Sequence, residues 1–210
     1  MSRTRIAVLC SALALMVPAS GAHAQAVGAA TQAILAKMMG EAMPLLLEAT
    51  ATLTEAQGNK QAADSLKAQI EEIRSGATTR DKAVVERAMT LTSSASTSLT
   101  TSLAGQAREL TAEQRALFVK GAVQFFLAVK SSREVLQMLP SLTTALAGAT
   151  SGGPLAIARN ARDLPMAKHV VTGIPEMIKG NIQAAGALKD YIVANKIPVD
   201  ASAMAAAFAP

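Results

Sequence analysis

The side chains that could carry chemistry in this 210-residue chain are few and lie far apart. His169 is the only histidine after residue 24, and a catalytic base of this kind needs a nucleophile and an orienting partner. No Gly-x-Ser-x-Gly elbow or other nucleophile motif accompanies it. We therefore interpret His169 as a surface or partly buried helical residue. An enzyme is the alternative that would depend on this side chain.

Metal-binding patterns are weak as well. Met38, Met39 and Met43 are close in sequence, and thioethers bind Cu(I). Three methionines on a helix are more typical of a core or a pliable apolar contact surface. Glu109 and Glu113 could share a helix face only if that helix ran unbroken between them. We expect no metal and no cofactor.

Other chemical readings are no stronger. The glycine-rich stretch 148–154 leads into an expected helix start, where backbone amides could hold an anion. It lacks the Gly-Lys-Ser/Thr of a phosphate-binding loop, so we interpret it as a connection. The carboxylates are scattered along the chain and form no pair of the kind that glycoside hydrolysis uses.

Composition predicts the class of fold. Half of the residues are apolar but only 2% are aromatic, so the core must be built from aliphatic side chains and methionine. Clusters of β-branched and aromatic residues with period-two alternation are missing, which favours an all-α protein. The net charge of +5 comes from interspersed bases and acids. With so few aromatics for stacking, nucleic acid binding is not expected.

The N-terminus has the layout of a secretory signal peptide over residues 1–24. Two early arginines precede an apolar run over 6–17, and a small-x-small pattern ends at Ala24. We expect cleavage between Ala24 and Gln25 and a periplasmic or secreted protein. The apolar run is shorter than the ~20 residues that a membrane span needs. Cys10, the only cysteine, lies inside this segment, so the mature chain would have no thiol.

Apolar spacing predicts about six helices in one all-α bundle domain over 25–198, followed by an Ala-rich tail over 199–210. The expected longer helices cover 27–57, 59–75, 78–110 and 114–139. Shorter helices broken by prolines are expected over 154–163, 165–171 and 175–196. Pro44 is expected to kink or break the first helix.

One long segment is ambiguous. Ten of the thirteen residues in 90–102 are Ser or Thr, which also suits a disordered linker. Leu91, Ala95, Leu99 and Leu103 nevertheless repeat at helical spacing, so we favour a helix. Its small side chains would let a neighbouring element approach closely.

The predicted bundle is organised around a central apolar helix, 114–139, which starts at a capping box over Thr111–Gln114 and stops at Pro140. A helix that is apolar nearly all round must be covered by helices or by something else apolar. The simpler interpretation is that the other helices wrap it; the functional interpretation is that part of its surface lines a cavity for an apolar ligand, because ligand pockets are mostly apolar. The expected lining is Phe118, Val119, Ala122, Phe125, Phe126 and Val129. Lys120 and Gln124, one turn apart, could contact a polar head group.

Two functions fit these patterns. The first is an exported, non-catalytic protein that binds or carries an apolar, lipid-like ligand inside the bundle. The alternative is a structural or protein-interaction bundle of the cell envelope without a small-molecule ligand, for which an exposed patch of Met38, Met39 and Met43 is expected to make the contact. Neither reading includes a transmembrane span in the mature chain.

Overall fold

The computed structural model describes residues 19–76, 81–104, 109–151 and 153–208. Within these ranges the chain forms α-helices and one π-helical turn, and no strand. The elements are α1 (Ala19–Lys37), η1 (Met38–Ala42), α2 (Met43–Ala56), α3 (Lys60–Gly76), α4 (Lys82–Leu103), α5 (Ala112–Ser151), α6 (Gly153–Asn160), α7 (Leu164–Ala194) and α8 (Ala201–Phe208). The prediction of an all-α protein is confirmed. Most of the predicted signal peptide lies outside the described residues.

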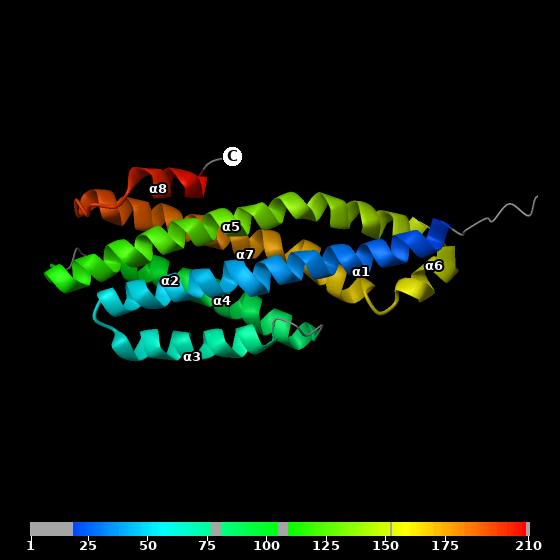
Figure 1. The fold of residues 1–210 in the computed structure, drawn as a ribbon, viewed down its shortest axis with the longest axis horizontal. Coiled ribbons are helices and arrows are strands. Elements are labelled where there is room, and N and C mark those ends of the chain that lie inside the picture. Colours follow the sequence, from blue (N-terminus) through cyan, green and yellow to red (C-terminus); the bar gives the residue numbers. More distant parts are fainter. Residues whose placement is uncertain (1–18, 77–80, 105–108, 152, 209–210) are drawn as a thin grey trace, which may run out of the picture.

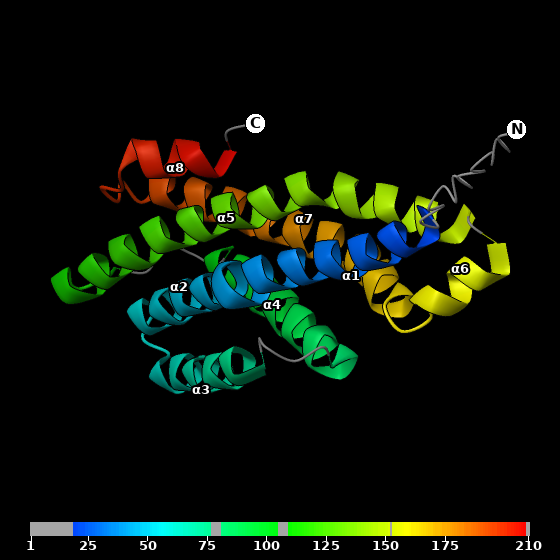
Figure 2. The same ribbon diagram turned by 45° about the vertical axis from the view of Figure 1, so that its right-hand side comes forward.

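Six longer helices, α1 to α5 and α7, pack together as a bundle. Figure 1 shows them running roughly along the long axis, with α3 on one edge and the short α8 on the opposite edge. Turned by 45°, the bundle shows α4 crossing beneath α2 while α3 lies apart from α7 (Figure 2). α5 packs against α1, α2, α7 and α8, and α3 packs chiefly against α2.

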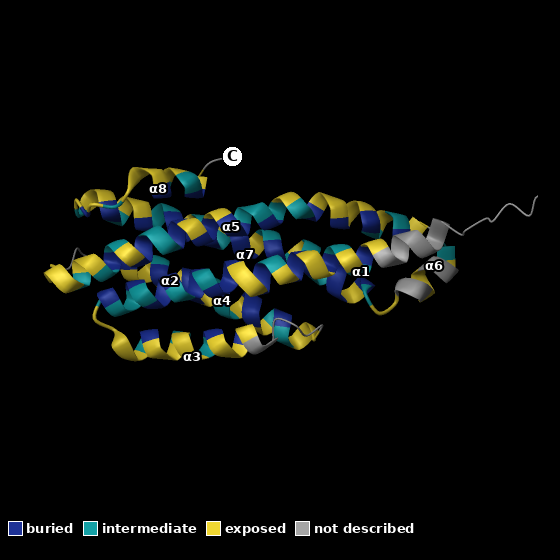
Figure 3. Ribbon diagram, in the orientation of Figure 1, coloured by how far each residue is buried: buried dark blue, intermediate teal, exposed yellow. Residues whose placement is uncertain are grey.

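The core has two apolar clusters that share the same long helices. The first contains Met39, Leu47 and Ile174 among others, and the second contains Phe118, Phe125 and Leu188. α2, α4, α5 and α7 each contribute to both clusters. Figure 3 shows the buried residues of these helices turned inward and a largely exposed outer side on α3.

Buried polar residues lie where the helices pass from one cluster to the other. Ser96 on α4, Ser131 and Ser132 on α5, and Asn181 on α7 fall between the members of the two clusters along each helix. The Ser132 hydroxyl donates to the Ala128 carbonyl at 2.8 Å, and the Ser131 hydroxyl donates to Glu41 Oε1 at 3.0 Å. The interior therefore contains a polar layer in which most groups find partners.

The predicted start of the long apolar helix is confirmed. The Gln114 N–H donates to Thr111 Oγ1 at 3.2 Å, and the Thr111 N–H donates to Gln114 Oε1 at 3.0 Å. This reciprocal pair satisfies two donors that a helix start leaves unpaired. One stripe of α5 faces solvent, including Lys120, Leu127 and Lys130.

The predicted end of that helix at Pro140 is wrong, because α5 continues through it to Ser151. Proline removes one backbone hydrogen bond and clashes with the preceding turn. Here the ring is exposed, while Leu139 and Leu142 beside it are buried in the first cluster. Burial of these flanking side chains outweighs the local penalty, which sequence periodicity alone does not reveal.

The predicted break at Pro175 is also wrong, since α7 runs unbroken from Leu164 to Ala194. Ile174 and Ile178 are fully buried on either side of it, so packing again keeps the helix continuous. At Pro44 the chain does not break: the π-helical turn η1 precedes it, and α2 follows directly with Pro44 in its first turn. In η1 the Met43 N–H donates to the Met38 carbonyl, which is a π-helical spacing.

The Ser/Thr-rich segment is helical, as predicted, within α4. Asp81 caps it, accepting from the Ala83 N–H at 2.8 Å, and the predicted start of this helix at residue 78 lies outside the described residues. The Ala-rich tail includes α8, where Ala207 is buried and its carbonyl accepts from Arg133 at 3.1 Å. In the parts of the chain described, no helix has the length and apolarity needed to cross a membrane.

Candidate functional site: a hydroxyl-lined groove

The residues predicted to line a cavity lie in the second core cluster. Phe118, Ala122, Phe125, Phe126 and Val129 are fully buried, and Val119 is half-buried. Of the predicted head-group contacts, Lys120 is exposed. Gln124 is half-buried, and its Oε1 has no hydrogen-bond partner among the described residues.

Other helices cover these phenylalanines. The ring of Phe118 lies 5.3 Å from that of Tyr191 on α7, and the ring of Phe126 lies 6.4 Å from that of Phe208 on α8, centroid to centroid. On the α2 side, Gly121 lets Leu53 approach so closely that an added Cβ would lie 2.9 Å from Leu53 Cγ. In this conformation the predicted lining is packed protein core.

The methionine patch proposed for protein contact is not exposed. Met38, Met39 and Met43 have exposed fractions of 1%, 0% and 1%, so the prediction of a surface patch was wrong. The π-helical turn and the start of α2 direct all three thioethers into the first core cluster. These side chains fill core volume, as unbranched methionine commonly does.

His169 is half-buried on α7, and its Nδ1 lies 3.8 Å from Glu86 Oε1 on α4. Glu86 also pairs with Lys82 at 3.0 Å. Across the described ranges, no three His, Cys, Asp or Glu side chains converge as a metal site would require. His169 borders an open surface depression with Ser93 and Glu176.

A more enclosed groove of about 280 Å³ lies between α2, α3 and α4. Its residues come from three helices and the turn between α2 and α3: Thr50, Thr54, Gln57, Asn59, Ala62, Leu66, Leu91, Ser94, Ala95, Ser98, Leu99 and Ser102. α3 packs mainly on α2 and touches α4 much less, which leaves this space between them. The lining combines aliphatic carbon with hydroxyl and carboxamide groups.

Hydroxyls line the groove in two rows because Ser and Thr repeat every four residues. Ser94, Ser98 and Ser102 follow one another on α4, and Thr50 and Thr54 do so on α2. Residues four apart share a helix face. In each row the hydroxyls thus lie one above another along the groove.

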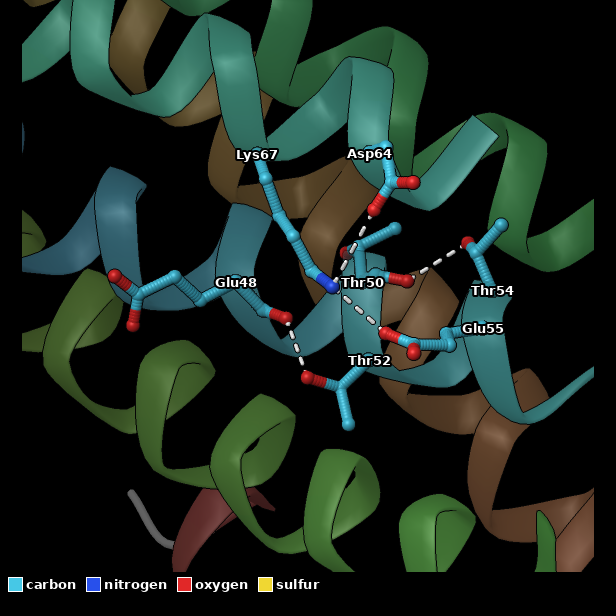
Figure 4. A network of polar contacts seen from close by, with 7 residues as sticks. All are labelled: Glu48, Thr50, Thr52, Thr54, Glu55, Asp64 and Lys67. Carbon is cyan, nitrogen blue, oxygen red and sulfur yellow. Dashed lines mark hydrogen bonds and ion pairs between the residues drawn. The ribbon is translucent and has the colours of Figure 1, made fainter. Parts of the chain in front are cut away.

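The hydroxyl groups of the groove differ in how their protons are used. Thr50 donates to the Leu46 carbonyl at 2.8 Å, and Thr54 donates to the Thr50 carbonyl at 2.7 Å, as Figure 4 shows for the second bond. Ser102 likewise donates to the Leu99 carbonyl at 2.9 Å. Ser94 and Ser98 are exposed and make no hydrogen bond within the described ranges. Their hydroxyls can donate or accept.

Charged side chains that neighbour groove residues in sequence, such as Glu55 beside Thr54 and Lys67 beside Leu66, pair with one another. Lys67 Nζ lies 2.7 Å from Glu55 Oε2 and 3.7 Å from Asp64 Oδ1 (Figure 4). The hydrogen bond between them lowers the pKa of the Glu55 carboxyl and raises the pKa of the Lys67 ammonium. Farther along α3, Arg74 pairs with Glu48 of α2. The Lys67–Glu55 and Arg74–Glu48 pairs connect α3 to α2 across the outer side of the bundle.

Sequence reasoning missed this groove, although its signal was present. Apolar spacing predicts the Ser/Thr-rich segment 90–102 to be a helix with small side chains, but it does not predict a binding groove beside that helix. The four-residue spacing from Ser94 to Ser102 could have indicated a hydroxyl row, and so could Thr50 with Thr54. The three-helix arrangement that joins the rows is a tertiary feature.

Comparison of the chain with protein-family models, with curated proteins and with solved structures finds no match. The groove between α2, α3 and α4 remains the candidate site. Its aliphatic floor and hydroxyl rows can hold a small molecule by burial and hydrogen bonding.

Proposed function

We propose that this chain is a non-catalytic binding protein for an apolar ligand, and that the ligand lies in the groove between α2, α3 and α4. The observation that carries the proposal is the lining, in which Leu66, Leu91 and Leu99 lie among hydroxyl side chains. Ligand pockets are mostly apolar with a few polar groups that fix orientation. The proposed protein is exported, which the signal peptide pattern over residues 1–24 supports.

The rest of the bundle serves in this proposal as a rigid support. We propose that α5 is its organising helix, because it packs against α1, α2, α7 and α8. α2 lies between α5 and the groove: Leu53 packs against Gly121 of α5, while Thr50 and Thr54 line the groove. A binding site built on packed helices holds its side chains more precisely than one on loops.

The experiment measures binding of naphthalene, an uncharged ten-carbon probe, by saturation-transfer NMR. Ser98→Phe places an aromatic ring in the groove at an exposed position. Thr97→Phe is the matched control, since Thr97 is exposed on the same helix but does not line the groove. We expect Ser98→Phe to weaken naphthalene binding at least tenfold and Thr97→Phe to leave it unchanged. Equal binding by both variants would refute the proposed site.

A protein-interaction bundle is the second candidate, and exposed apolar side chains favour it. Val193 is 64% exposed, Ile157 45% and Leu127 44%. Single exposed apolar residues are common, so this observation is weaker than the groove. Light scattering of the purified protein tests it: a stable complex that Val193→Ser and Leu127→Ser disrupt would support this candidate, and a monomer at all concentrations would count against self-association.

A further inference from the structure

We infer that the ligand of this groove is a short, single-chain molecule with an uncharged polar end that can donate a hydrogen bond, such as an alcohol or a primary amide. This inference rests on the proposed function and names the chemical class of its ligand. Three features carry it: the charges around the groove, the use of the hydroxyl protons, and the volume.

The charges come first. Every residue that lines the groove has an uncharged side chain. Lys67, which follows Leu66 in sequence, is already paired with Glu55 and Asp64. A carboxylate or an ammonium on the ligand would therefore lose water without gaining an opposite charge, which is costly. The groove disfavours charged ligands of either sign.

The hydroxyl protons decide which neutral group fits. Thr50, Thr54 and Ser102 already donate to helix carbonyls, so they present oxygen lone pairs to the groove. Ser94 and Ser98 can act as donor or acceptor. A ligand that only accepts hydrogen bonds, such as an ester or an ether, would leave these three acceptor oxygens unmatched. A hydroxyl or primary amide both donates and accepts, so it matches these oxygens as well as Ser94 and Ser98.

The ends of the groove differ, which orients the ligand. α3 runs antiparallel to α2, because Lys67 pairs with Glu55 while Arg74, farther along α3, pairs with the earlier Glu48. Gln57 and Asn59 therefore lie together at the turn end, and Leu66 lies farther along the groove. The polar end of the ligand is placed toward the turn and its hydrocarbon chain toward Leu66 and Leu91.

The volume limits the length of that chain. A space of 280 Å³ holds about nine groups of the size of a water molecule, at roughly 30 Å³ each. A two-chain lipid would extend well beyond this space. A chain of about eight carbons with one polar group does.

The test compares three ligands that share an eight-carbon chain: 1-octanol, octanoate and octylammonium. The full chain is titrated with each at pH 7 and followed by amide chemical shifts. We expect 1-octanol to bind at least tenfold more tightly than either charged ligand, with the largest shifts at Ser98 and Ser102. Ser98→Lys should improve octanoate binding and leave octylammonium weak, whereas Thr97→Lys should alter neither.

The outcomes separate this inference from the proposed function. Octanoate or octylammonium binding as tightly as 1-octanol would overturn the inference while leaving a binding groove intact. Naphthalene binding without any 1-octanol binding would also overturn it. Failure of naphthalene and of all three chain ligands would refute the proposed function itself.

Discussion

The Ser96 hydroxyl on α4 donates a 2.7 Å hydrogen bond to Oδ1 of Asn181 on α7, inside the core between the two apolar clusters. Asn181 is fully buried, and its Nδ2 has no hydrogen-bond partner in the described part of the chain. A buried polar group costs free energy when its partner is removed. This pair therefore links two parallel helix faces while already leaving one donor unpaired.

We predict that Ser96→Ala destabilises the protein by about 1–3 kcal/mol, because it leaves the whole Asn181 carboxamide buried without a partner. The double variant Ser96→Ala/Asn181→Leu should recover most of that loss, since it removes both polar groups. Urea unfolding of the two variants and the parent measures both changes. A double variant less stable than Ser96→Ala would contradict the prediction.

The second prediction concerns the stability change when a side chain is added at Gly121 on α5. A Cβ there would lie 2.9 Å from Leu53 Cγ and 3.1 Å from the Leu53 backbone N, which cannot easily move. We expect Gly121→Ala to cost about 1–3 kcal/mol through overpacking. Gly186→Ala on α7 is the control, because no described atom lies within 4 Å of its added Cβ. It should stabilise the helix by roughly 0.5–1 kcal/mol. Thermal unfolding distinguishes the two glycines by opposite changes in Tm.

Glu41 predicts a dependence of stability on pH. Its carboxylate accepts from Lys37 at 2.9 Å and from Ser131 at 3.0 Å, and the hydrogen bond from Lys37 is the main cause of its pKa lying below the ordinary value of 4.5. A depressed folded pKa stabilises the protein above the unfolded pKa, and this contribution is lost as pH falls through the folded pKa.

The matching variant is Glu41→Gln. The Tm of the parent should exceed that of the variant at pH 7, and the difference should vanish as pH falls well below 4.5. The difference will be small, because Glu41 is half-exposed and solvent screens the pair. A difference that persists unchanged in acid would show that the carboxylate charge is not its cause.

Pro140 lies within α5 and is exposed. Replacing it with alanine restores the backbone hydrogen bond to the Leu136 carbonyl, so we expect stabilisation of up to ~3 kcal/mol. Pro165 in the first turn of α7 is the control, since proline is well tolerated there. In guanidinium unfolding, the midpoint concentration should be higher than that of the parent for Pro140→Ala but not for Pro165→Ala. Equal effects at the two prolines would argue against a strained helix interior.

Sequence patterns that act over a few residues predicted the local secondary structure reliably. The Thr111–Gln114 capping box acts within four residues, so its two hydrogen bonds could be predicted before any tertiary contact was known. The Leu91–Leu103 spacing similarly predicted a helix through a Ser/Thr-rich segment. The breaks expected at Pro140 and Pro175 failed because buried neighbours such as Leu139 and Ile174 decide there, and their burial depends on other helices.

The site was harder to predict than the fold. Phe118 and Phe126 are predicted to line a cavity because they lie on an apolar helix in a chain where aromatic residues are rare. Their rings instead pack against Tyr191 and Phe208, which belong to the C-terminal part of the sequence. The groove depends on three helices meeting at an angle that leaves space beside α4. Spacing within one helix identifies a hydroxyl row but does not tell what faces it.

The sharing of helices between the two core clusters has a consequence for how the protein opens. α2, α4, α5 and α7 each reach into both clusters, so neither cluster can come apart without the other. Among the described residues, α3 contributes only Ile70 and Ile73 to the first cluster and nothing to the second. Among the six longer helices, α3 contributes the fewest residues to the clusters, so its release disturbs the core least. Its amides should exchange with solvent before those of α2, α4, α5 and α7, and the groove would open to its full width while Phe118 stays covered.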